Sequence, residues 1–190
     1  PLQDIKEGLK FIKVHSVFSF LISMTFFNSF FGMAYVMLMP IFAVDILDVG
    51  AEGQGLLLGM SGAGALVNTL YIGARGSVPH RGLAIIAGAV LFGLAVAAFA
   101  LTAEYVGSLS LAMGLMFIMG IFNSLYMISI QSSLQIMVPD RMRGRVMGFY
   151  GMTWSIMPLG GLQASALTSI WNAPIAIAAG GLAVAAFALG

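Results

Sequence analysis

Residues 109–148 read LSLAMGLMFIMGIFNSLYMISIQSSLQIMVPDRMRGRVMG, a long uncharged run followed by a short basic segment. Crossing the hydrocarbon layer of a bilayer takes roughly 20 apolar residues of helix, and the uncharged run is longer than that. Of the whole chain, 60% is hydrophobic and only 8% is charged, whereas soluble domains carry about 25% charged residues. The stretch therefore indicates a membrane-spanning helix that ends in a charged loop.

The same pattern divides the chain into six spans. Charged side chains are absent from the windows 14–44, 53–74, 82–103, 105–139 and 146–190. The last window is long enough for two spans, and WNAP at 171–174 separates them. We predict an all-α integral membrane fold with spans, numbered one to six, at about 16–41, 54–74, 83–103, 109–137, 146–169 and 174–190.

Other fold classes do not fit this composition. A soluble helical core would need helices with a solvated polar face, which these windows lack. Barrel strands would alternate between polar and apolar residues, and no such alternation occurs here. The chain has no cysteine, which excludes disulfides and thiolate metal sites within it.

The basic residues are confined to alternate loops. Lys6, Lys10 and Lys13 precede span one, Arg75 and Arg81 lie between spans two and three, and Arg141, Arg143 and Arg145 lie between spans four and five. The intervening loops hold only acids or no charge: Asp45, Asp48 and Glu52 in one, and Glu104 in the next. Cytoplasmic loops collect Lys and Arg, so we predict a plasma (inner) membrane protein whose N- and C-termini are both cytoplasmic.

Residues 1–15 form an amphipathic segment ahead of the six-helix domain at 16–190. As a helix, this segment separates apolar residues from lysines: Leu2, Ile5, Leu9 and Ile12 against Lys6, Lys10 and Lys13. We therefore predict a short helix in the membrane interface that leads into span one. Because the chain starts without Met and ends inside an apolar run, we expect it to be part of a longer chain.

A short repeat relates spans one and four. FFNSFFG at 26–32 and IFNSLYM at 121–127 share Phe-Asn-Ser, which places Asn28 and Asn123 at matching positions. Three spans separate the copies, so the second copy has the opposite orientation in the membrane. The pattern predicts an inverted 3+3 repeat, an architecture found in secondary carriers.

Spans one and four also carry most of the polar side chains. Polar groups at membrane depth need a partner or water, so they either hydrogen-bond neighbouring helices or line a solvent-filled path. Both explanations stay open. We predict that Asn28 and Asn123 face away from spans three and six, which have no polar group at their centres. The candidate pathway residues are Asn28, Asn123, Ser124, Tyr126, Gln131 and Gln135.

Glycines and prolines indicate where helices pack or bend. Gly55 and Gly59 share one face of span two and predict a seam where another helix approaches closely. Pro40 lies in span one and Pro158 in span five, and each removes a backbone donor from its helix.

The basic loops allow two interpretations. Their arginines either set topology and contact anionic headgroups, or form a gate latch that pairs with acids or helix ends in one transport state only. Asp140 can also cap the helix that follows it. The candidate gate or topology residues are Arg75, Arg81, Asp140, Arg141, Arg143 and Arg145.

Two longer segments are similar to a known family. They are LMPIFAVDILDVGAEGQGLLLGMSGAGAL at 38–66 and VPDRMRGRVMGFYGMTWSIMPLGG at 138–161. With the order of spans, they resemble the C-terminal half of a major facilitator superfamily transporter, in its drug- and siderophore-exporter (enterobactin-type) branch. The family's loop signature Gly-x-x-x-Asp-Arg-x-Gly-Arg is only partly kept in GARGSVPHRG at 73–82, which lacks the Asp-Arg.

This resemblance implies one half of a twelve-helix secondary transporter, with the N-terminal six-helix half missing. We expect proton-coupled export of small amphipathic molecules by alternating access, and as partners the lipid bilayer, a small-molecule substrate and the missing half. No acid or histidine lies mid-membrane in these spans, so a proton-carrying residue has to come from the missing half. The alternative is a membrane subunit of an ATP-driven pump or another channel-like scaffold, although the chain contains no phosphate-binding G-x-x-x-x-G-K-[ST] loop. We expect no enzymatic activity, metal, cofactor or nucleic acid.

Overall fold

The computed structural model describes residues 2–76, 78 and 80–190, with side chains described from residue 6 onward. Helices make up this part of the chain, and it contains no strand. In order they are α1 (Leu2–Val14), α2 (Ser16–Phe27), η1 (Asn28–Gly32), α3 (Ala34–Ile41), η2 (Phe42–Ile46), α4 (Gly50–Arg75), α5 (Arg81–Val106), α6 (Leu109–Met137), α7 (Asp140–Trp154), α8 (Met157–Thr168) and α9 (Ala173–Leu189).

Four helices are long and apolar enough to cross a membrane: Ser16–Ile46, Gly50–Arg75, Arg81–Val106 and Leu109–Met137. They match the first four predicted spans. The first consists of α2, η1, α3 and η2 in succession and extends past the predicted end at residue 41. Pro40 lies inside α3 and does not end the helix, which continues as η2 to Ile46.

The predicted fifth span at 146–169 consists of two helices, α7 and α8, with a break after Trp154. Helix α7 already begins at Asp140, inside the basic segment, and ends at Trp154. Helix α8 starts at Met157 and has Pro158 in its first turn. Since Pro158 has no backbone N–H, it fits the start of a helix better than its interior. The sixth segment, α9, is apolar but spans only 17 residues.

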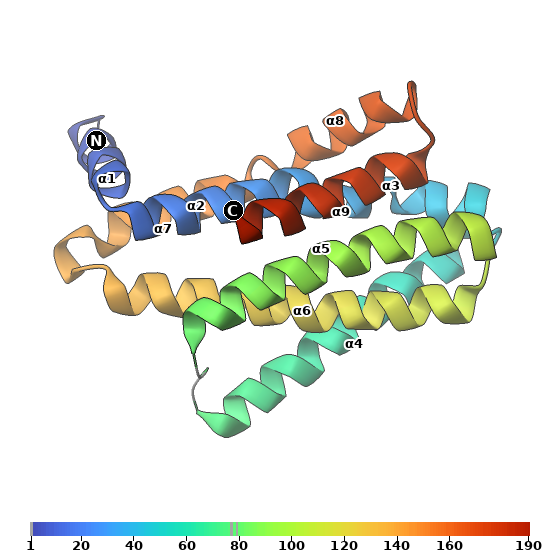
Figure 1. The fold of residues 1–190 in the computed structure, drawn as a ribbon, viewed down its shortest axis with the longest axis horizontal. Helices are drawn as coiled ribbons and strands as arrows, with labels where there is room; N and C mark the ends of the chain where they lie inside the picture. The colour runs from blue at the N-terminus through green and yellow to red at the C-terminus, as the bar shows by residue number, and fades with distance from the viewer. Residues whose placement is uncertain (1, 77, 79) are drawn as a thin grey trace.

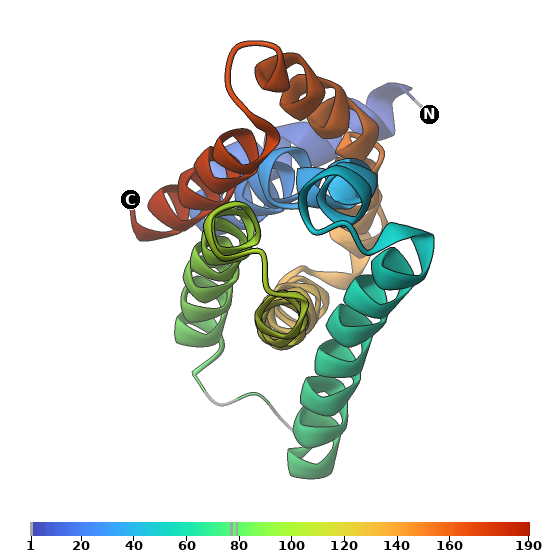
Figure 2. The same cartoon turned by 90° about the vertical axis from the view of Figure 1, so that its right-hand side faces the viewer.

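The helices pack in a bundle with α6 between α4 and α5, and with α5 between α6 and α9 (Figures 1 and 2). Close approach depends on glycines at these contacts. A Cβ on Gly88 of α5 would lie 2.9 Å from the backbone nitrogen of Tyr126 in α6. A Cβ on Gly93 of α5 would lie 2.3 Å from the carbonyl oxygen of Gly181 in α9. These backbones therefore meet directly, as in small-residue packing within membranes.

Helix α1 lies crosswise at one end of the bundle and packs against α2 and α7. Figure 1 shows it nearly end-on at one end of the molecule, crosswise to the long helices. Ile12 is buried, but Leu9 of the predicted apolar face is 41% exposed, and the side chains of Leu2 and Ile5 lie outside the described residues. The crosswise direction suits a helix in the membrane interface.

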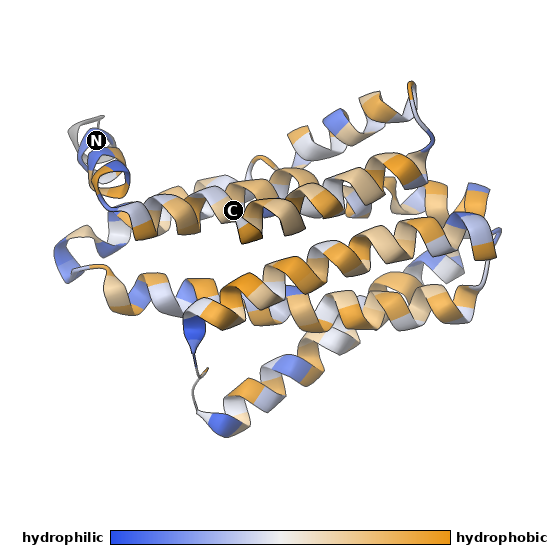
Figure 3. Cartoon of the chain, viewed as in Figure 1, coloured by the Kyte–Doolittle hydropathy of each residue, from blue (hydrophilic) through white to orange (hydrophobic). Residues whose placement is uncertain are grey.

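All three basic segments lie at the same end of the bundle. Figure 1 places α1, the α4–α5 link and the α6–α7 link together on its left, and the α5–α6 and α8–α9 links on its right. Figure 3 shows apolar residues along the long helices and hydrophilic ones at the α4–α5 link. The charges thus separate toward the ends of the helices, as expected for a bundle that crosses a membrane.

Candidate functional site

The polar side chain of Ser124 joins α6 to α4. Asn68 Nδ2 donates to Ser124 Oγ at 3.1 Å, and Ser124 Oγ donates to the Ala65 carbonyl oxygen at 3.2 Å. The hydroxyl of Thr69 lies 3.2 Å from Ser124 Oγ. Ser124 is only 8% exposed, so its hydrogen-bonding capacity is used between the two helices. Sequence reasoning missed Asn68 and Thr69, since nothing in the sequence indicates which helix faces Ser124.

Tyr126 is buried against the first span. Its hydroxyl donates to Thr25 Oγ1 at 3.4 Å, and Thr25 Oγ1 donates to the Leu21 carbonyl oxygen at 2.9 Å. Both residues have an exposed fraction of zero. This arrangement is a contact between α6 and α2 within the bundle.

Asn28 opens a π-helical turn in the middle of the first span. The Met33 N–H donates to the Asn28 carbonyl oxygen at 2.9 Å, the wider spacing that defines η1. The Asn28 side chain is fully buried, and neither its Oδ1 nor its Nδ2 has a hydrogen-bond partner among the described residues. An unpaired buried amide costs about 1–3 kcal/mol, and π-helical turns are frequent at functional sites.

The Asn28 amide points in a direction that differs from our expectation. Its Oδ1 lies 2.9 Å from the position of a Cβ on Gly32, and atoms of Phe92 and Val184 lie 3.0 and 3.3 Å from the same point. Phe92 belongs to α5 and Val184 to α9, which are spans three and six. The amide therefore faces these spans rather than away from them. Asn28 and Gly32 are four residues apart and therefore share one face of the helix.

The remaining pathway candidates lie on α6 at different degrees of exposure. Asn123 is partly buried, and its Oδ1 is a buried atom without a hydrogen-bond partner. Gln131 and Gln135 are exposed. Together with Ser124 and Tyr126, they do not gather at one point. Ser124 and Tyr126 form contacts between helices. Asn123, Gln131 and Gln135 have polar side-chain atoms for which no hydrogen bond is described.

A groove that sequence reasoning missed lies between α2 and α7. It encloses about 350 Å³, and its lining is mostly apolar: Ile22, Ser23, Phe26, Phe27, Phe149, Met152, Thr153 and Ile156. Phe26 is 39% and Met152 61% exposed. Aromatic rings with a flexible thioether suit contact with varied apolar shapes.

A second groove lies between α3 and α8, toward the other end of the bundle. It encloses about 410 Å³ and is lined by Met37, Leu38, Pro158, Gly161, Leu162 and Ser165. Between the grooves the two backbones touch, because a Cβ on Gly160 would lie 2.1 Å from the Phe30 carbonyl oxygen. The first span thus has a groove on either side of one tight crossing.

The arginines of the α6–α7 segment have different roles. Arg145 of α7 forms an ion pair with Glu7 of α1, and a Cβ on Gly8 would lie 3.2 Å from the Arg145 Cβ. This contact joins two separate elements. Arg143 instead pairs with Asp140 at 2.6 Å, three residues earlier on the same helix, so that pair stays within α7. Arg141 is exposed.

The other two basic candidates flank the α4–α5 link. The Arg75 guanidinium lies over the Tyr71 ring, 4.7 Å from its centroid, and this contact lies within the last turns of α4. Arg81 is the first residue of α5. Neither residue shares a described ion pair with the α6–α7 segment, so the structure does not gather the six gate candidates into one cluster.

The predicted seam on α4 lies on the wrong face for its contact with α6. Gly55 and Gly59 have no atom within 4 Å of where a Cβ would stand. The close contact uses Gly64 instead, whose Cβ would lie 2.0 Å from the Phe117 carbonyl oxygen. Reciprocally, a Cβ on Gly120 would lie 1.9 Å from the Ser61 carbonyl oxygen. Any packing role of Gly55 and Gly59 therefore stays a prediction for contacts outside this chain.

Comparison with known proteins identifies the family. Among the described residues, no set of three His, Asp or Glu side chains could hold a metal ion. Neither curated proteins nor solved structures give a match. The profile of the Major Facilitator Superfamily matches residues 2–162, which is most of the chain and includes the four long apolar helices. The protein is therefore an integral membrane protein that belongs to the Major Facilitator Superfamily of secondary transporters.

Proposed function

We propose that this chain is the C-terminal half of a twelve-helix exporter that couples the outward movement of small amphipathic molecules to proton entry. Drug- or siderophore-like substrates fit the resemblance of residues 38–66 and 138–161 to that branch of the family. In this proposal the spans form an inverted 3+3 repeat, and the basic end with both termini faces the cytoplasm across an inner membrane.

The observation that carries the substrate class is the groove between α2 and α7. Its rings and thioether offer apolar contact, and Ser23 supplies a hydroxyl group without charge. The hydroxyl of Thr153 already donates to the Tyr150 carbonyl oxygen at 2.6 Å. Such a lining favours molecules recognised by shape and apolar area with a few hydrogen bonds. Asn123, Gln131 and Gln135 extend the proposed path on α6, because an amide both donates and accepts hydrogen bonds. Asn28 is left out of this path, because its buried amide faces spans three and six.

The grooves and the crossing between them support alternating access. One groove lies on each side of the Phe30–Gly160 contact, so a small rotation of α7 and α8 against the first span would widen one and narrow the other. Proton coupling then requires a group from the other half, because no acid or histidine lies at the centre of these spans.

Transport by the complete carrier in lipid vesicles tests this proposal, with ethidium as the probe. An imposed pH gradient should drive ethidium movement without ATP. Met152→Ala and Phe26→Ala should each change the apparent ethidium affinity severalfold, because both side chains line the groove. Leu91→Ala is the matched control, since Leu91 lies exposed on α5 away from both grooves. Movement that needs ATP would favour the pump alternative, and equal effects of all three substitutions would contradict the groove assignment.

Within this proposal, the Glu7–Arg145 pair acts as a cytoplasmic latch. It holds α1 against α7, and α7 continues toward the groove. The pair is partly exposed, with side-chain exposures of 55% for Glu7 and 27% for Arg145. Exposed pairs contribute about 0–1 kcal/mol, so its loss should shift the balance of transport states by no more than about fivefold.

Substitutions separate a latch from a merely topological role. Arg145→Lys keeps the charge but loses the planar fork that suits a carboxylate, and it should alter the transport rate with normal membrane insertion. Glu7→Gln should reproduce that change. Arg143→Lys is the control, because its pair with Asp140 lies within one helix. Full transport activity of both Arg145→Lys and Glu7→Gln would contradict the latch and indicate that the arginines only set the membrane topology.

A further inference from the structure

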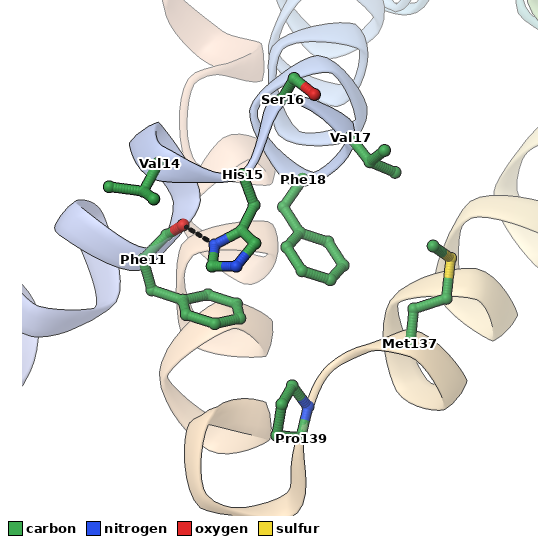
Figure 4. Close-up of a pocket in the computed structure, with 8 residues that line it drawn as sticks. All are labelled: Phe11, Val14, His15, Ser16, Val17, Phe18, Met137 and Pro139. Atoms are coloured by element: carbon green, nitrogen blue, oxygen red, sulfur yellow. Dashed lines mark hydrogen bonds between the residues drawn. The ribbon is translucent and has the colours of Figure 1, made fainter.

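A cavity lies where α1 turns into α2 and α6 turns into α7. It encloses about 490 Å³ and is lined by Phe11, Val14, His15, Ser16, Val17, Phe18, Met137 and Pro139 (Figure 4). The first long apolar helix begins at Ser16 and the fourth ends at Met137. The cavity therefore lies at the membrane-interface end of two spans, on the end of the bundle that carries the basic segments.

The walls of this cavity are mainly apolar and open outward. Val14 is 70%, Val17 49% and Met137 51% exposed. The rings of Phe11 and Phe18 stack with their centroids 5.3 Å apart. Apolar side chains that stay exposed at the end of a span favour contact with hydrocarbon over contact with water. The cavity is thus suited to an acyl chain.

His15 supplies a polar group inside the same cavity. Its Nδ1 lies 2.8 Å from the Phe11 carbonyl oxygen, and a carbonyl only accepts, so Nδ1 carries the donated hydrogen. Figure 4 shows the second ring nitrogen directed into the space between Phe11, Phe18 and Pro139. With the hydrogen on Nδ1, Nε2 is left as an acceptor, which suits a hydroxyl group of a lipid headgroup.

The charges around the cavity are predominantly positive. Lys13 lies two residues before His15, and Arg141 lies two residues after Pro139. Neither lines the cavity, but both belong to the basic segments at this end of the bundle. Glu7 and Asp140, the acids of α1 and α7 whose side chains the structure describes, are each paired with an arginine. Their charges are therefore partly neutralised, and the potential left around the cavity attracts an anion.

From this combination we propose that the cavity binds one phospholipid with an anionic headgroup. The acyl chain lies along Val17, Phe18 and Met137, and His15 Nε2 accepts a hydrogen bond from a headgroup hydroxyl. Lys13 and Arg141 supply positive charge at the same end of the bundle. The lipid would then connect the α1–α2 corner to the α6–α7 corner. This site differs from the substrate path and does not depend on which substrate the carrier moves.

Native mass spectrometry of the complete carrier, purified in mild detergent, tests the site directly. Phosphatidylglycerol should remain bound and raise the melting temperature, whereas phosphatidylcholine with the same acyl chains should bind more weakly. Glycerol 3-phosphate, which has the charge without the chains, should not raise the melting temperature. Equal retention of the two phospholipids would overturn the proposal.

Variants locate the site. Lys13→Gln should weaken phosphatidylglycerol binding about fivefold, which is the effect of one cation near an anionic headgroup. His15→Leu should also weaken it, by removing the acceptor for the headgroup hydroxyl. Lys6→Gln is the matched control, because it removes the same charge two turns earlier on α1. Val17→Trp should reduce binding of both phospholipids by filling the cavity. If Lys13→Gln matches Lys6→Gln and Val17→Trp changes nothing, the lipid binds elsewhere and the proposal fails.

Discussion

Replacing Gly120 by alanine should separate α6 from α4. The new Cβ would lie 1.9 Å from the Ser61 carbonyl oxygen, whereas ordinary contact begins at 3.4 Å. The obstacle is backbone rather than a flexible side chain, so the helices must move apart by about 1.5 Å at the crossing. Adding one methyl group at Gly120 therefore requires α6 to move away from α4.

The cost follows from the contacts at this crossing. Ser124 lies one turn after Gly120, and its hydrogen bonds to Asn68 and Ala65 are 3.1 and 3.2 Å long. Separation by about 1.5 Å breaks both, and each such bond contributes about 0.6 kcal/mol in membrane proteins. Overpacking adds about 1–3 kcal/mol. We expect a total loss of about 2–4 kcal/mol of stability.

Thermal unfolding of the purified carrier in detergent measures this loss. Gly120→Ala should lower the melting temperature by at least about 4 °C. Gly114→Ala, on the same helix, and Gly59→Ala, on α4, should leave it unchanged or slightly raised, because a Cβ at either position meets no atom and alanine favours helix. Equal melting of Gly120→Ala and Gly114→Ala would refute the crossing. If Gly59→Ala instead lowered the melting temperature, another helix would have to pack closely against the Gly55–Gly59 face of α4, as the sequence predicted.

Three further predictions concern topology and the polar residues of α6. Cysteines at Asp48 and Gly107 should react with an impermeant thiol reagent from outside intact cells and a cysteine at Met142 only after permeabilisation; labelling of Met142→Cys from outside would invert the topology. Tyr126→Phe should cost less than about 1 kcal/mol, because it removes one long hydrogen bond, whereas Tyr126→Ala should cost about 3–5 kcal/mol through its cavity; similar melting of the two would mean that the ring is not packed as described. Asn123→Leu should change ethidium affinity more than melting temperature and Ser124→Ala should do the reverse, because Ser124 is bonded to α4; the opposite pattern would exchange their roles.

The long helices could be predicted because charge is excluded from hydrocarbon. The fourth span, expected at 109–137, is α6 from Leu109 to Met137. Local signals mark both ends: Ser108 accepts from the Leu111 N–H at the start, and Pro139 follows two residues after the end. The break of the fifth span before Met157 was harder to locate, since Pro158 identifies a weak point in a helix but does not fix the residue at which the helix stops.

The partners of the polar residues could not be predicted in this way. Helical spacing gives the face that a residue occupies but not the helix that this face meets. Glycines occur on several faces of α4, including Gly55, Gly59 and Gly64, and only the position of α6 selects Gly64. The helices that the Asn28 amide faces likewise depend on which helices lie beside η1, and these are α5 and α9.

In this transporter chain, the buried polar groups and the grooves lie in different places and have different roles. Ser124 and Tyr126 use their hydroxyl groups to hold helices together, while the grooves beside the first span are largely apolar. The spans carry no charge at their centres. Protonation of a group elsewhere in the transporter would therefore change the width of the grooves through movement of the packed helices. The Phe30–Gly160 crossing is rigid backbone contact, whereas the Glu7–Arg145 pair is exposed and weak. We infer that α7 and α8 pivot at the crossing, and that the pair at the basic end opens and closes as they do.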